Sequence, residues 1–103
     1  MINEIKRKFA RHEWLYTRHS ADRSIERDIW SKEIEEAISS GEIIENYPED
    51  KYGPSLLILG RTEDERPLHI QISLPRAGEK IKVITVYQPD LKNWKEGFKE
   101  RKD

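Results

Sequence analysis

The sequence predicts an α+β domain, in which two N-terminal helices pack on a twisted antiparallel sheet of about four to five strands, followed by a short C-terminal helix. Three observations support this prediction. Helical spacing and capping signals lie before residue 41, β-rich runs begin at Glu42, and short turn-forming links join those runs. Short links favour antiparallel neighbours. A chain of 103 residues has room for a single domain with a modest core.

The N-terminal stretch is predicted to form a short amphipathic helix over residues 2–12, because Ile2, Ile5 and Phe9 recur at helical spacing among Lys and Arg. We treat residues 1–13 as this helix or as an extension of the domain, and residues 14–99 as the single α+β domain. The run WLYTR, residues 14–18, has the aromatic and β-branched content of a short strand.

A polar ladder of His19, Arg23 and Arg27 marks the next predicted helix, residues 19–28. Positions four apart drift by only about 40° around an α-helix, so the imidazole and the two guanidiniums are expected on one side. The apolar side chains of this helix are expected on another side; they are Ala21, Ile25 and Ile29.

A further helix is predicted over residues 32–39. Ser31 is a suitable N-cap, and Gly41 is a C-terminal stop signal. We expect this helix to bury Ile34, Ala37 and Ile38.

Four β-rich runs follow, at residues 42–47, 55–60, 66–74 and 80–87. The run SLLILG is apolar at every interior position and therefore suits a central strand covered on both faces. The next run alternates apolar and polar residues, which predicts one core face and one polar face. We expect the polar face, which carries His69, Gln71 and Ser73, to be the more exposed one.

The C-terminal helix is predicted over residues 91–99. Leu91, Trp94 and Phe98 are spaced three and four residues apart, so one side of such a helix would dock on the domain.

Composition excludes several classes of function. The chain has no Cys, which removes thiol nucleophiles, disulfides and Cys-type zinc sites and agrees with a reducing compartment. It contains no P-loop, G-x-G-x-x-G, H-E-x-x-H or G-x-S-x-G motif. We therefore expect no cofactor and no metal. No stretch is apolar enough for a membrane span or a signal peptide, so we expect a cytoplasmic protein without a membrane partner.

Charge is unevenly distributed along the chain. Residues 33–65 carry two Lys or Arg against ten Asp or Glu, whereas both ends are basic. If the ends meet in the fold they form a cationic face for nucleic acid. The alternative, that these charges are ordinary solvated surface, has equal weight.

The ladder residues have two interpretations. Arg offers a fixed fork of donors for phosphate or carboxylate, and His titrates near neutral pH, so the ladder is a candidate anion or RNA site. Alternatively, one or more of the three residues has a structural role, packing under a sheet or pairing with Glu26 or Asp22.

Several segments of the chain form a distinctive set of motifs. They are YTRHSADRSIERDIW, the strand GEIIENYP, SLLILG, RPLHI and ITVYQPD with a following Trp. Over about residues 14–94 this set resembles a family of small bacterial and archaeal proteins described as a domain of unknown function and grouped with the RelE-like and BrnT-like toxins.

The resemblance implies a RelE-like fold and a toxin of a toxin-antitoxin system, acting as a metal-independent endoribonuclease on mRNA. It also implies a cognate antitoxin and RNA or the ribosome as partners. A homodimer is a further expectation. Fold alone does not establish activity, so we keep as alternatives a non-catalytic protein-interaction module of the same fold and a member that has lost its activity.

Candidate residues exist for each role in metal-independent RNA cleavage. His19 or His69 is the candidate base or acid, Tyr87 positions the substrate or donates a proton, and Tyr52 and Trp94 stack on unpaired bases. The phosphate would be stabilised by Arg23, Arg27 and Arg66. Each of these residues also has an alternative, structural role. His69 would be held by hydrogen bonds, Tyr87 would cover the edge of the core, and Trp94 would anchor the C-terminus.

Overall fold

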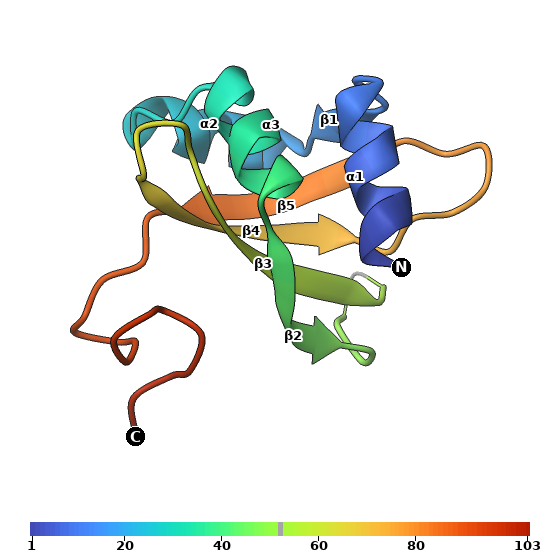
Figure 1. Cartoon of the computed structure of the whole chain (residues 1–103). Coiled ribbons are helices and arrows are strands. Elements are labelled where there is room, and N and C mark those ends of the chain that lie inside the picture. The colour runs from blue at the N-terminus through green and yellow to red at the C-terminus, as the bar shows by residue number, and fades with distance from the viewer. Residues whose placement is uncertain (52) are drawn as a thin grey trace.

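The computed structural model describes residues 1–51 and 53–103 as an α+β fold with three helices and one five-stranded sheet (Figure 1). The helices are α1 (Ile2–Ala10), α2 (Arg18–Glu26) and α3 (Ser31–Ser39). The strands are β1 (Trp14–Tyr16), β2 (Glu42–Tyr47), β3 (Ser55–Arg61), β4 (Pro67–Ser73) and β5 (Ile81–Tyr87). None of the helices in these ranges is long and apolar enough to cross a membrane.

The sheet is mixed, in the order β1-β5-β4-β3-β2. Strands β2 to β5 form the predicted antiparallel series, but β1 pairs in parallel with β5, with Leu15 opposite Lys82. The prediction of a purely antiparallel sheet is therefore wrong at this edge. Short turns determine only the pairing of strands that are neighbours in the sequence, and the partner of β1 lies near the other end of the chain.

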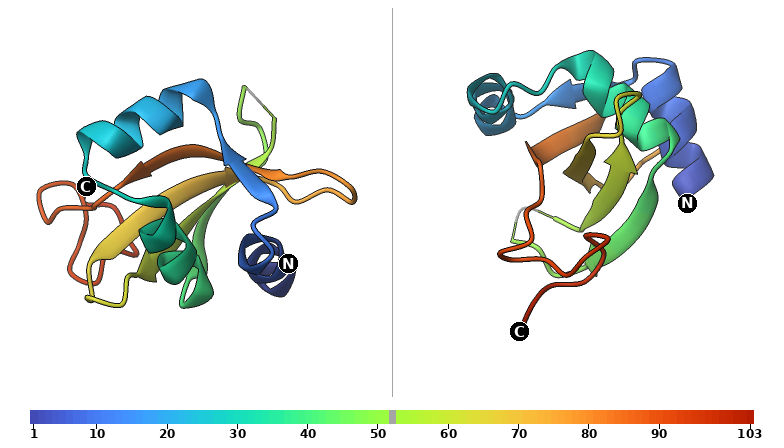
Figure 2. Two further views of the ribbon diagram at one scale, coloured as in Figure 1. Left: turned by 90° about the horizontal axis from the view of Figure 1, so that it is seen from above. Right: turned by 60° about the vertical axis from the view of Figure 1, so that its left-hand side comes forward.

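All three helices lie on one face of the sheet, and the residues after β5 cross the opposite face (Figure 2). The core lies between the helices and the sheet. Helix α1 contributes Ile5 and Phe9 to it, and α3 contributes the three residues predicted to be buried. The link between α2 and α3 adds Ile29, and the strands supply the rest: Leu56, Ile58, Leu68, Ile70, Ile72, Ile81, Val83 and Val86.

Helix α3 approaches the sheet closely because Gly60 of β3 has no side chain. A Cβ atom at this position would lie 1.8 Å from the carbonyl oxygen of Ala37. At the start of the helix, the backbone N–H of Trp30 donates to Glu33 Oε1 at 3.0 Å. The helix thus begins one residue before the prediction, with Trp30 rather than Ser31 as the capping position.

Helix α2 packs on the sheet through serines rather than through its apolar residues. Ser20 and Ser24 are buried, and the hydroxyl of Ser20 donates to the carbonyl oxygen of Val83 at 2.6 Å. Ile25 is 77% exposed and takes no part in this packing. Small polar residues allow the helix to approach β5, and each hydroxyl is satisfied by a backbone carbonyl.

The predicted C-terminal helix does not form. Residues 88–103, here called the C-terminal segment, consist of turns with one isolated bridge between Trp94 and Arg101. Asp90 Oδ1 accepts hydrogen bonds from the backbone N–H groups of Lys92 and Asn93, which stabilises a turn. Gly97 and Phe98 have φ angles of 89° and 61°, incompatible with a right-handed helix. Trp94 reaches the sheet from a loop instead.

Candidate functional site

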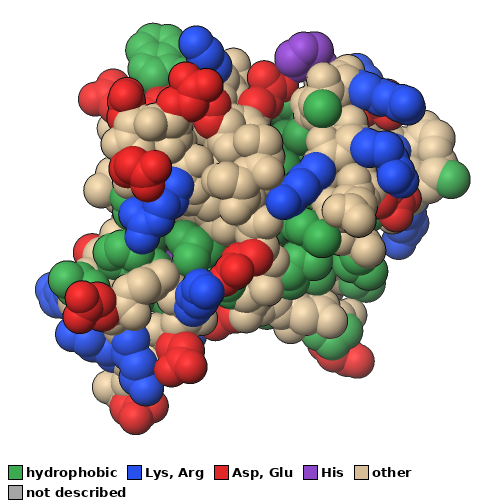
Figure 3. Space-filling model, viewed as in Figure 1, with side chains coloured by type: hydrophobic (Ala, Val, Ile, Leu, Met, Phe, Trp, Pro, Cys, Tyr) green, Lys and Arg blue, Asp and Glu red, His purple; other side chains and the backbone are tan. Residues whose placement is uncertain are grey.

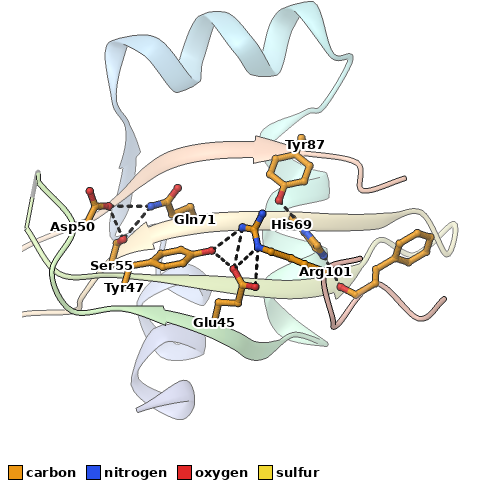
Figure 4. Close-up of polar contacts among 9 residues, drawn as sticks. Glu45, Tyr47, Asp50, Ser55, His69, Gln71, Tyr87 and Arg101 are labelled. Carbon is orange, nitrogen blue, oxygen red and sulfur yellow. Dashed lines mark hydrogen bonds and ion pairs between the residues drawn. The ribbon is translucent and has the colours of Figure 1, made fainter. Parts of the chain in front are cut away.

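A polar cluster occupies the sheet face opposite the helices. Because side chains alternate along a strand, Glu45 and Tyr47 of β2, His69 and Gln71 of β4 and Tyr87 of β5 project from this face (Figure 4). The register places His69 directly opposite Tyr87. The expectation that this face is the exposed one is wrong for its centre, since the C-terminal segment covers it. His69 is 0% exposed and Trp94 is 3% exposed.

The two ring nitrogens of His69 have different roles. Nε2 lies 2.7 Å from the carbonyl oxygen of Phe98, which can only accept, so Nε2 carries the proton. Nδ1, 3.0 Å from the hydroxyl of Tyr87, is then the acceptor of that hydroxyl's hydrogen bond. Burial lowers the pKa of His69, more than the Phe98 hydrogen bond and Glu45 raise it. The imidazole is therefore neutral at neutral pH, with Nδ1 as a base. Burial also raises the pKa of Tyr87, which keeps the phenol protonated.

Arg101 joins the C-terminal segment to β2. Its Nε donates to Glu45 Oε2 at 3.1 Å and its Nη2 to Glu45 Oε1 at 3.0 Å, while the guanidinium lies 4.6 Å from the centre of the Trp94 ring. The hydroxyl of Tyr47 also donates to Glu45. Burial alone would raise the pKa of Glu45, but the hydrogen bonds from Arg101 and Tyr47 together outweigh it and lower that pKa. Burial and the Glu45 hydrogen bond raise the pKa of Tyr47 to about 12.

Four of the predicted site residues lie where β4 begins and β5 ends, but they form two separate pairs. Arg27 Nη1 donates to the carbonyl oxygen of Val86 at 2.8 Å. Arg66 Nη2 donates to the carbonyl oxygen of Arg27 at 3.1 Å, and its Nε to Gln88 Oε1 at 2.8 Å. This pair lies on the helix side of the strand ends, whereas His69 and Tyr87 contact each other on the opposite face of the sheet.

The other two ladder residues lie elsewhere on α2. His19 is exposed in the first turn, and Arg23 pairs with Glu26 at 3.0 Å on the helix surface. Helix α2 ends at Glu26, so Arg27 is its C-cap residue. With a rise of about 1.5 Å per residue, His19 is about 12 Å along the helix from Arg27. The ladder therefore does not form one site. Tyr52, the remaining predicted RNA-binding residue, lies outside the described residues.

A second polar group extends the cluster along the same face. Gln71 Nε2 donates to Asp50 Oδ2 and to Ser55 Oγ, both at 3.0 Å, and Ser55 Oγ donates to Asp50 Oδ2 at 2.8 Å. Gln71 and Asp50 line an open pocket of about 590 Å³ together with Tyr47 and Arg101. Within the described ranges, no group of three or more His, Cys, Asp or Glu residues has a geometry suited to a metal ion.

Sequence reasoning missed Glu45, Tyr47 and Arg101. For the first two a signal existed, because residues two apart in the run EIIENY share a face of the strand. Arg101 has no local signal. It reaches the cluster only because the C-terminal segment turns back across the sheet.

The fold and the cluster together define a small α+β domain with a buried polar group under its C-terminal segment. A model of the family described as "Domain of unknown function (DUF4258)" matches residues 16–88, more than half of the chain. The chain belongs to this family. No curated protein and no solved structure gives a significant match. The matched range contains β2 to β5, α2 and α3, but not the C-terminal residues Trp94, Phe98 and Arg101.

Proposed function

We propose that this protein is a RelE-like toxin of a toxin-antitoxin system, a metal-independent endoribonuclease that acts on mRNA. One observation supports the proposal above the others. The Tyr87–His69 pair, a phenol hydrogen-bonded to a neutral imidazole, lies at the strand ends whose backbone Arg27 and Arg66 contact from the helix side. A proton acceptor beside positive charge is what cleavage of RNA without a metal requires.

In the proposed reaction the 2′-oxygen of the RNA attacks phosphorus. Its proton passes to Tyr87 Oη while Tyr87 passes its own proton to His69 Nδ1, so the imidazole becomes a cation. The bond between phosphorus and the 5′-oxygen breaks, and the 5′-oxygen takes a proton from water. The hydroxide that remains takes back the proton of Tyr87 while His69 returns its proton to Tyr87, which restores the neutral imidazole. The products are a 2′,3′-cyclic phosphate and a free 5′-hydroxyl. Phe98 positions His69, because its carbonyl holds the proton on Nε2 and leaves Nδ1 free to accept.

Of the two arginines at these strand ends, Arg27 is the more available to a phosphate. Its side chain is exposed, and its Nη1 donates to the backbone carbonyl of Val86. Arg66 is less available, because it also forms an ion pair with Glu33 at 3.2 Å. We therefore assign Arg27 to the phosphate and Arg66 to positioning the backbone at residues 27 and 28.

A non-catalytic interaction module is the second candidate, and specific observations favour it. His69 is covered by Trp94 and the C-terminal segment, and Arg23 and Arg66 are engaged in ion pairs with acidic residues. Acidic and basic side chains are also interspersed over the face shown in Figure 3. RNA binding is chiefly electrostatic and favours a continuous basic surface.

Inducible expression in a bacterial host tests the proposal, with growth and total mRNA integrity as readouts. We expect the natural chain to arrest growth and fragment mRNA, and Tyr87→Phe to abolish both effects because it removes only the hydroxyl. Tyr16→Phe is the matched control, since Tyr16 is also half-buried with a pKa raised by burial but lies on β1.

Purified protein is then incubated with single-stranded RNA in the presence of EDTA. Cleavage that leaves cyclic phosphate ends supports the mechanism. Intact RNA and normal growth, with soluble protein confirmed, would reject the ribonuclease and favour the interaction module.

A further inference from the structure

The outer edge of β1 presents unpaired backbone groups. The carbonyl of Glu13 accepts from Ile81 N at 3.1 Å, and the N–H of Thr17 donates to the carbonyl oxygen of Val83 at 3.2 Å. Backbone groups alternate in direction along a strand, so the N–H and C=O groups of residues 13, 15 and 17 point toward β5. The N–H and C=O groups of Trp14 and Tyr16 therefore face away from the sheet. Seen from above, β1 lies uncovered by the ribbon of any described element (Figure 2, left).

The opposite edge of the sheet is protected by a bulge and by charges, whereas β1 has neither and limits edge pairing only by its length of three residues. Strand β2 has a bulge between Ile43 and Glu45, and its Glu42 and Glu45 form ion pairs with Lys99 and Arg101 of the C-terminal segment. Bulges and charges are the usual means of preventing edge pairing. Strand β1 has neither a charged residue nor a bulge, and its Leu15 is 40% exposed.

A pocket of about 400 Å³ lies beside this edge, between β1 and the start of α3. The carboxylate of Glu35 accepts hydrogen bonds at the pocket, from Trp14 Nε1 at 2.9 Å and from His12 Nδ1 at 2.6 Å. The rings of Trp14 and Tyr16 line it as well and meet edge to face, with centres 5.0 Å apart. A carboxylate flanked by aromatic rings suits a cationic side chain.

We propose that the outer edge of β1 is the docking site for an extended segment of a partner protein that carries a Lys or Arg residue. The segment adds a strand beside β1 through the backbone groups of Trp14 and Tyr16. Because its side chains alternate, one of them is directed to the helix side of the sheet, into the pocket and against Glu35. The inference uses no residue of the Tyr87–His69 cluster, so it stands whether or not the protein cleaves RNA.

A synthetic strand-forming peptide, Thr-Val-Arg-Val-Thr with blocked ends, tests the proposal against an otherwise identical peptide with Gln in place of Arg. Nuclear magnetic resonance of the full-length labelled chain is the readout. We expect the Trp14 and Tyr16 amides and the Trp14 indole to shift and these amides to exchange more slowly with solvent. The Arg peptide should bind about tenfold more tightly than the Gln peptide, as loss of one partly buried charged hydrogen bond predicts.

Glu35→Gln should remove the preference for Arg while leaving the backbone shifts. Glu36→Gln is the matched control on the same helix and should retain the preference. The carboxylate of Glu36 accepts a hydrogen bond from the backbone N–H of Glu63 and does not line the pocket. The proposal is overturned if millimolar peptide shifts no β1 amide, or if the preference for Arg survives Glu35→Gln. A concentration-dependent dimer in sedimentation experiments, with the same β1 amides perturbed, would assign the edge to a second copy of the chain and also overturn it.

Discussion

The imidazole of His69 and the ring of Trp94 meet edge to face, with centres 4.3 Å apart, across the boundary between the sheet and the C-terminal segment. Each ring buries the other. The contact attaches a segment without regular secondary structure to the centre of β4, and it determines how the polar face responds to mutation and to pH.

Trp94→Ala should destabilise the fold by about 3 kcal/mol, because a buried aromatic side chain is lost and His69 becomes exposed. Urea denaturation measures the change. Trp30→Ala is the control, since Trp30 is 71% exposed and its loss should alter the free energy of unfolding by no more than about 0.5 kcal/mol. Equal effects of the two variants would contradict the anchoring role of Trp94.

Stability should fall as the pH decreases below about 6.5, the ordinary pKa of His. Burial lowers the pKa of His69 in the folded state, so between the folded and the unfolded pKa the unfolded chain binds more protons. The contribution of neutral His69 to stability is complete above the pKa that His has in the unfolded chain. It is lost as the pH falls through the lower pKa of the folded state. Melting temperatures between about pH 8 and pH 5 test this. His69→Gln should flatten the profile in that range.

A second, more acidic transition should come from Glu45. Its folded pKa is lowered, mainly by Arg101 and Tyr47 acting against burial, so its contribution is present above the ordinary carboxyl pKa and is lost as the pH falls through the lowered value. Arg101→Gln should weaken this acid dependence. A double-mutant cycle with Glu45→Gln should give a coupling of about 0.5 to 1 kcal/mol, since the Arg101 side chain is largely solvated. The same cycle on the exposed Lys99–Glu42 pair should give a smaller coupling.

Gly60→Ala should cost more than about 3 kcal/mol or prevent folding, because the new methyl group would overlap the backbone of Ala37. Soluble yield and thermal denaturation measure it. Gly78→Ala provides the comparison. No atom lies within 4 Å of a Cβ at that position, so only its φ of 78° is unfavourable, at about 1 kcal/mol. A mild effect of Gly60→Ala would mean that α3 and β3 separate more easily than the structure indicates.

Local signals in the sequence predicted most of the regular elements. The predicted strands at residues 42–47, 55–60, 66–74 and 80–87 agree with β2 to β5 to within a residue or two, and β3 is buried on both faces as expected. Periodicity failed where the decisive contacts are non-local. Leu91, Trp94 and Phe98 have helical spacing, but turn geometry at Asp90 and Gly97 and the burial of Trp94 on the sheet override it.

The candidate site could be predicted only in part, because its contacts are also between residues far apart in the sequence. Arg27, Arg66, His69 and Tyr87 could be selected by residue type, yet only the register of β4 against β5 shows that His69 and Tyr87 meet, and only the fold shows that the arginines lie on the helix side of the strand ends. The ladder was misleading because α2 ends before Arg27 and turns its serines toward the sheet. Arg101 could not have been selected, since its role depends on the path of the C-terminal segment.

The pairing of β1 with β5 has a consequence for how the protein is made. On the ribosome the N-terminal strand emerges early, but its partner is the last strand of the sheet to be synthesised. Until Ile81–Tyr87 leaves the exit tunnel, Trp14, Leu15 and Tyr16 have no strand beside them on either edge. Until then the nascent chain cannot complete its sheet, and in that interval it exposes an apolar strand to chaperones and to other nascent chains.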